Sequence, residues 1–126
     1  MTDPSALLAV LPSNQTFRRL LQLAGPQTGA DLLARLVEDL LAAQEGLIFA
    51  VTPVDWSALR AHSHVLVALA GAVGATPLQT LAEDLNRAAN VQQAAVISAL
   101  LDKALPRLAT LIEYMSEQHA RPDQMP

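Results

Sequence analysis

Residues 53–74, PVDWSALRAHSHVLVALAGAVG, are the stretch that most directly predicts the fold. At about 100° per residue, its larger apolar side chains fall on one side of a helix. These side chains are Leu59, Leu66, Leu69, Ala70 and Val73. Thr52 can act as an N-cap, Pro53 suits the first helical position, and Asp55 stands where a capping box has its carboxylate. Gly74 is typical of a helix end, so we predict an amphipathic helix over residues 53–73.

Two neighbouring helices follow from the same signals. Residues 29–51 carry leucines and valines at helical spacing, which predicts one long helix with a wide buried stripe. The next helix should begin after Thr76, which can cap it, with Pro77 at its first position and Gln79 at its third. We expect this helix to end near Ala88.

The two ends of the chain add a short helix and a long one. Residues 16–23 predict a short helix, ended by Gly25 and Pro26. Asn90 can cap a final long helix, which Pro106 interrupts. Since proline removes a backbone donor and clashes with the preceding turn, we expect either a kink there or two helices end to end.

The composition favours an all-α protein. The chain is 52% apolar but only 3% aromatic, and the strong helix formers Leu and Ala supply most of its apolar residues. A length of 126 residues suits one domain with its own core. We predict an arm over residues 1–14, a helical bundle over 15–119 and a disordered tail over 120–126. The predicted fold is a four-helix bundle with an extra short N-terminal helix.

Charge and cysteine content exclude several functions. The net charge is −4, and the eight basic residues are spread from Arg18 to Arg121. Nucleic-acid binding depends on clustered basic residues, so we expect no such partner. The absence of cysteine excludes a disulfide framework and a thiol nucleophile. No signal-peptide pattern and no clean apolar run of about 20 residues is present, so we expect a cytoplasmic protein without membrane contact.

The phase of the helix over residues 53–73 separates its two histidines. His62 falls at the edge of the apolar side, where a partly buried, hydrogen-bonded histidine is the favoured interpretation. His64 falls nearly opposite, toward solvent or a partner. His119 stands near the end of the last helix, where it can interact favourably with the helix dipole. The neighbours of His64 on its side of the helix are mostly small: Arg60, Ala61, Val67, Ala68 and Gly71.

Around His64 the chain resembles the histidine-containing phosphotransfer (HPt) domains of two-component phosphorelays. The family has an apolar residue two positions after its phosphorylated histidine, Lys at three, Gly at four, a small residue at seven and Gly at ten. The corresponding residues here are Leu66, Val67, Ala68, Gly71 and Gly74. The similarity extends over about residues 29–88, and it departs from the family where Val67 replaces the lysine and Ala68 the glycine.

The resemblance implies a function and a site. His64 is the expected phospho-acceptor, and Arg60, Ala61, Val67, Ala68 and Gly71 are the expected partner-docking residues. The expected partners are a response-regulator receiver domain, a sensor histidine kinase or both, and the chain is expected to act as a monomeric carrier more than as an enzyme. No cofactor or metal is expected on this chain, because Mg²⁺ would be bound by the receiver.

Two other functions stay open at the sequence level. One is a degenerate HPt-like protein that docks a receiver or a kinase without being phosphorylated, which the missing lysine favours. The other is an oligomerising bundle in which the small residues around His64 form a subunit contact. A hydrolase or metal enzyme ranks last, because no carboxylate pair, Ser-His pair or two-histidine metal spacing falls on one helix face.

Overall fold

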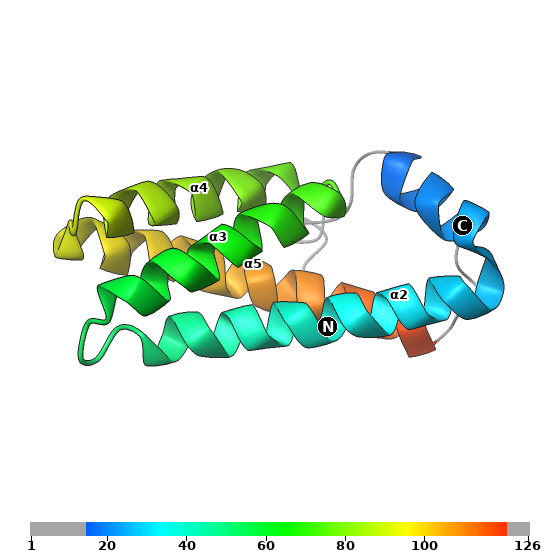
Figure 1. The fold of residues 1–126 in the computed structure, drawn as a ribbon, viewed down its shortest axis with the longest axis horizontal. Coiled ribbons are helices and arrows are strands. Elements are labelled where there is room, and N and C mark those ends of the chain that lie inside the picture. The colour runs from blue at the N-terminus through cyan, green and yellow to red at the C-terminus, as the bar shows by residue number, and fades with distance from the viewer. Residues whose placement is uncertain (1–14, 121–126) are drawn as a thin grey trace.

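The computed structural model describes residues 15–120, and this part of the chain is all-α. Its four helices are α2 (Gln15–Phe49), α3 (Trp56–Ala72), α4 (Thr76–Asn90) and α5 (Ala94–Ala120). Each helix runs antiparallel to the next (Figure 1). α2 and α4 both pack against α3 and α5, which closes the four helices into a bundle. The predictions of an all-α fold and of a four-helix bundle are confirmed.

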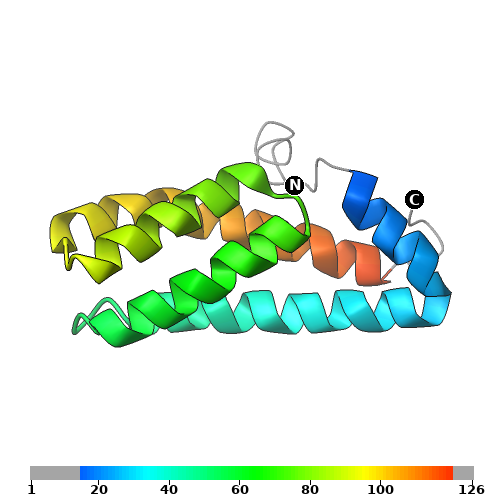
Figure 2. The ribbon, with the colours of Figure 1, turned by 45° about the horizontal axis from the view of Figure 1, so that its top comes forward.

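The predicted short helix over 16–23 is helical but is not a separate element. It forms the first part of α2, which non-helical φ/ψ at Gly25 interrupts with a sharp bend, and no further N-terminal helix is seen in the described residues (Figure 2). Gly25 has φ 84° and ψ 171°, a conformation that glycine adopts readily because it has no Cβ. Pro26 follows at once, and its fixed φ suits a first helical position. The chain therefore changes direction without a loop. The predicted arm over 1–14 lies outside the described residues, and so do residues 121–126 of the predicted tail over 120–126.

The starts of α3 and α4 differ from the predicted ones. Asp55, and not Thr52, is the N-cap of α3, since the Ala58 backbone N–H donates to Asp55 Oδ1 at 3.0 Å. This cap is about one turn later than predicted because the preceding residues form a tight turn, closed by a bridge between Val51 and Val54. α4 begins at Thr76 itself, with Ala75 as a cap residue that offers no side-chain acceptor.

The predicted role of Asn90 is also corrected. Asn90 is the last residue of α4, where its Nδ2 donates to the Asn86 backbone oxygen at 2.9 Å, and it does not cap α5. The turn that follows contains Gln92 at φ 56°, and α5 starts only at Ala94. The side chain that we expected to start one helix therefore strengthens the end of the previous one.

α5 continues through Pro106 as a single helix. Of the two predicted alternatives, two separate helices end to end is therefore wrong. Because Pro106 has no backbone N–H, the carbonyl of Asp102 has lost its helical donor. Both residues are exposed, so water can reach that carbonyl. Neighbouring side chains support this turn. Arg107 donates to the Lys103 backbone oxygen at 2.8 Å, and Thr110 Oγ1 donates to the Pro106 oxygen at 3.0 Å.

The core runs along the bundle axis and is built mainly of leucine. Large side chains repeat every seven residues on all four helices, which suits helices packed at shallow angles. The largest fully buried side chains are Leu33, Leu40, Leu47, Leu59, Leu66, Val73, Leu78, Leu85, Leu108, Leu111 and Met115. Burying one such side chain stabilises the fold by about 1.5–3 kcal/mol. None of the helices in the described residues is long and apolar enough to cross a membrane.

α2 and α3 approach closely where a histidine meets a glycine. A Cβ placed on Gly46 would lie less than 3.0 Å from Cε1, Nε2 and Nδ1 of the His62 ring. Real Cβ atoms essentially never show such distances, so the ring fits only against the bare glycine backbone. The His62 ring therefore occupies the space that a side chain at position 46 would need.

The first prediction tests this contact. Gly46→Ala should lower the free energy of unfolding by about 1–3 kcal/mol, because the added methyl group overpacks the site. In a His62→Ala background the same change should be neutral or stabilising, since alanine is the better helix former. Urea denaturation of the two single variants and the double variant measures the difference.

Gly29→Ala in the same helix is the matched control. Its added Cβ would meet Leu21 atoms only at 3.5 and 3.8 Å, so it should stabilise the protein by about 0.5–1 kcal/mol. An equal cost for Gly46→Ala with and without the His62 ring would show that the contact does not limit the approach of the helices.

Candidate functional site

His64 lies on the exposed side of α3, as its helical phase predicts. The exposed residues of this helix form what we call the His64 face: Ser57, Ala61, His64, Val65, Ala68 and Ala72. Apart from the His64 imidazole, none of them has an ionisable side chain. A solvated helix face normally carries Glu, Lys and Arg instead. The face is therefore small, uncharged and centred on one imidazole.

Three of the five predicted docking residues are not part of the His64 face and lie on the side of α3 toward α4. Arg60, Val67 and Gly71 are half-buried, whereas Ala61 and Ala68 are exposed. A Cβ on Gly71 would lie 2.8 Å from the Nε2 atom of Gln79, so the Gln79 amide covers this glycine from α4. Gly71 therefore serves the packing of α3 on α4 more than the open surface that we expected around His64.

A polar network joins α3 to α4 at the turn of α3 that precedes His64. Ser63 is fully buried, and its hydroxyl donates to the Arg60 backbone oxygen at 3.2 Å. From α4, Asn86 Nδ2 donates to the same oxygen and to Ser63 Oγ, both at 3.1 Å. Asn90 Nδ2 in turn donates to Asn86 Oδ1 at 3.1 Å. These hydrogen bonds fix the rotation of α3 about its own axis, relative to α4, at the turn that precedes His64.

His62 lies on the opposite edge of α3, against Gly46 of α2. It is half-buried, as predicted. The hydrogen bond that we expected for its ring is not found among the described residues, where packing on the glycine backbone takes its place. The side chain of His119 lies outside the described residues. On α3, therefore, the structure brings His64 to the surface and uses His62 for packing.

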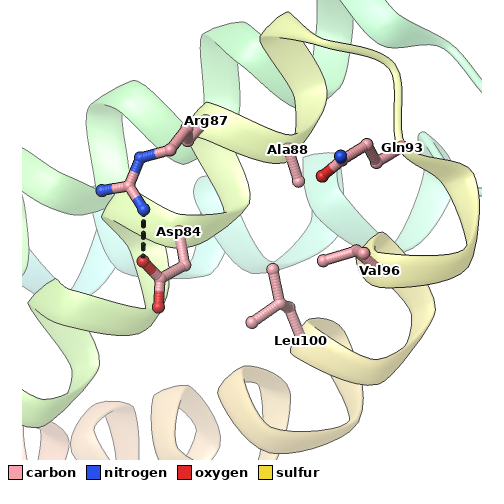
Figure 3. A pocket seen from close by; sticks show the side chains of 6 residues that line it. All are labelled: Asp84, Arg87, Ala88, Gln93, Val96 and Leu100. Atoms are coloured by element: carbon pink, nitrogen blue, oxygen red, sulfur yellow. Dashed lines mark hydrogen bonds and ion pairs between the residues drawn. The ribbon is translucent and has the colours of Figure 1, made fainter.

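A separate hollow of about 220 Å³ lies between α4 and α5 (Figure 3). Its lining residues are Asp84, Arg87, Ala88, Gln93, Val96 and Leu100. Arg87 Nη1 pairs with Asp84 Oδ1 at 3.2 Å on the rim. Ala88 and Asn86 are two residues apart and so face different sides of α4. The hollow is therefore on the α5 side of α4, away from the His64 network.

Among the side chains that the structure describes, no group of three or more His, Cys, Asp or Glu is placed to hold a metal ion. The candidate chemistry rests on the His64 imidazole and its immediate neighbours.

No protein-family model, curated protein or solved structure matches this chain. The resemblance to HPt domains consequently stays a prediction from the residues around His64. What the structure adds to it is the four-helix all-α fold and the exposure of that histidine.

Sequence reasoning did not find the contacts that orient α3. The partners Ser63 and Asn86 are 23 positions apart, and helical periodicity on one helix gives no information about the other. Gly46 did offer a signal, since an isolated glycine inside a helical pattern often marks a close packing contact. Its partner His62 is visible only in the folded structure.

The second prediction concerns the Asn86 network. Asn86→Ala should lower the free energy of unfolding by about 1–3 kcal/mol, since it removes the two part-buried hydrogen bonds that Asn86 Nδ2 donates from α4 to α3. Ser63→Ala should be destabilising alone and less so when Asn86 is already alanine, because the two side chains share a hydrogen bond. Thermal and urea denaturation of the double-mutant cycle measures this coupling.

Asn90→Ala is the control for this cycle. Asn90 is exposed and bonds only within α4, so its removal should change stability by no more than about 0.5 kcal/mol. Strict additivity of Ser63→Ala and Asn86→Ala would contradict an energetic link between the two helices at this point.

Proposed function

We propose that this chain is a phosphorelay intermediate. In this proposal His64 accepts a phosphoryl group from a phospho-aspartyl receiver domain, or from a histidine kinase, and passes it to a response regulator. The observation that carries the proposal is the presentation of His64, an exposed imidazole at the centre of a small, uncharged helix face. The positions of Leu66, Gly71 and Gly74 after this histidine, which resemble the HPt motif, support the same function.

The proposed step uses the neutral imidazole as a nucleophile. The lone pair of His64 Nε2 attacks phosphorus and forms the N–P bond. The P–O bond to the aspartyl carboxylate breaks, and its electron pair returns to that carboxylate. Nδ1 keeps its proton during the transfer. The reverse reaction uses the same bonds, so one histidine can both receive the group and deliver it.

The shape of the His64 face suits an approach by another protein. In-line transfer needs the attacking nitrogen, the phosphorus and the leaving oxygen close together and aligned. Ala61 and Ala68 are exposed about one turn before and after His64, and they hold little bulk between its ring and a partner. The absence of charged side chains on this face also removes the cost of desolvating them on docking.

The receiver is expected to supply most of the charge compensation. Phosphoryl transfer depends mainly on positioning and on cations that neutralise the transferred group. In this proposal Mg²⁺ belongs to the receiver's aspartyl site, and this chain provides the nucleophile and the docking face. It is therefore a carrier whose contribution depends on its partner.

A second candidate function is docking without phosphorylation. Val67 stands where HPt domains have a lysine, and its half-buried apolar side chain cannot donate to a phosphoryl oxygen. A protein that keeps the docking face but does not take up phosphate would compete with true carriers for the same receiver.

The third prediction tests the proposed function. On incubation with a ³²P-labelled phospho-receiver from the same organism, the wild-type chain should acquire an acid-labile label. His64→Gln should abolish it, because glutamine retains a polar side chain but has no nucleophilic ring nitrogen. His62→Gln is the matched control and should retain the label, since His62 faces α2.

The other outcomes separate the alternatives. Binding of the receiver with no label on the wild-type chain would favour the docking function. Label that persists in His64→Gln would refute the assignment of the acceptor. A tight homodimer in sedimentation, with His64 protected from diethyl pyrocarbonate, would favour an oligomerising bundle.

A further inference from the structure

A phosphoryl group on His64 would carry negative charge and would need a donor from this chain once the partner has left. On a helix, only residues three or four positions away lie beside a given side chain. Around His64 these are Arg60, Ala61, Val67 and Ala68. Arg60 is the only one with a hydrogen-bond donor in its side chain.

The guanidinium of Arg60 is not committed to a carboxylate in the structure. The other cation of α3 and α4, Arg87, pairs with Asp84 at 3.2 Å on the outer side of α4. Within the described residues Arg60 makes no ion pair and no side-chain hydrogen bond. Its five N–H donors therefore face no internal competitor.

The Arg60 backbone is nevertheless held firmly. Its carbonyl oxygen accepts from both Ser63 Oγ and Asn86 Nδ2, at 3.2 and 3.1 Å, and the side chain is half-buried along the α3–α4 edge. Helical side chains lean toward the N-terminus of their helix, so the His64 ring leans over the turn that contains Arg60. The fixed backbone thus places a flexible cation one helical turn before His64, on the side toward which the ring leans.

We propose that Arg60 is the phosphoryl-binding cation of this site, with its guanidinium donating to the oxygens of a phosphoryl group on His64 Nε2. This inference rests on the proposed function and goes one step further, because it assigns the charge compensation that Val67 does not provide. No bond forms or breaks at Arg60. Its forked donors match two phosphoryl oxygens at once, as guanidinium groups do.

The fourth prediction uses phosphoramidate as a small donor, so that no partner protein is needed. His64 Nε2 attacks phosphorus, the P–N bond of phosphoramidate breaks, and ammonia leaves. Arg60→Ala and Arg60→Gln should lower the rate of uptake at subsaturating donor roughly tenfold, as expected for losing one charge-assisted contact. Arg60→Lys should restore part of the rate, because the charge returns without the fork. Phosphohistidine formation is followed by ³¹P NMR.

The dependence on salt distinguishes a charge contact from a structural effect. Uptake by the wild type should fall with rising NaCl as the cation is screened, and uptake by Arg60→Gln should be nearly independent of salt. Arg87→Ala is the matched control, since it removes one arginine from the neighbouring helix on the side away from His64, and it should behave as wild type. Circular dichroism verifies that each variant is folded.

The outcomes distinguish the two levels of the proposal. Normal uptake by Arg60→Ala and Arg60→Gln, with label on His64, would overturn the role of Arg60 and leave the carrier function standing. A wild-type chain that takes up no phosphoryl group on His64 would overturn both. An equal loss in Arg87→Ala would show a general charge effect and would also overturn the specific role of Arg60.

Discussion

The rotation of α3 about its own axis is the constraint on which the rest of the site depends. Two contacts fix it from opposite sides. On the α2 side, the His62 ring lies against the bare backbone of Gly46. On the α4 side, Asn86 bonds to the Arg60 carbonyl and to buried Ser63. Because adjacent residues differ by about 100° on a helix, these contacts leave His64 on the surface.

The two contacts differ in kind and complement each other. The glycine contact is steric and gives the His62 ring its space between α2 and α3, whereas the asparagine network is directional and links α3 to α4 at one register. A core made mainly of leucine and alanine packs well in more than one rotational arrangement, since hydrophobic burial is not directional. Buried polar groups penalise the alternatives, because a rotated α3 would leave Ser63 and Asn86 without partners.

The sequence predicted the parts of the fold that depend on one helix at a time. Apolar spacing identified all four long helices, and the phase of α3 placed His64 on the surface without any structural information. Helix ends were less accurate. Thr52 and Asp55 are both good caps in isolation, and the turn closed by Val51 and Val54 decides between them. The expected N-terminal helix merged into α2 because Gly25 permits a sharp bend without a loop.

The site was predicted only in part for the same reason. His64, Ala61 and Ala68 are exposed because of local phase, which a single sequence contains. The burial of Gly71 under Gln79 and the anchoring of Arg60 by Asn86 depend on how α4 packs against α3. Periodicity along the sequence gives no information about that packing. In both cases the sequence failed to predict which residue of α4 covers the edge of α3. It did predict which residues of α3 surround His64.

The sparse charge around His64 would have a physical consequence for the proposed phosphoryl carrier. A group that must be both received and delivered is transferred efficiently only if the intermediate is neither much more nor much less stable than the two states it connects. Several cations around the ring would stabilise the bound phosphoryl group and raise the barrier to its departure. In the proposed carrier, one flexible guanidinium at the edge of an uncharged face would compensate part of the charge and leave room for a partner's own cations. Val67, at the position where HPt domains have a lysine, would then be compatible with transfer, provided that Arg60 supplies this single contact.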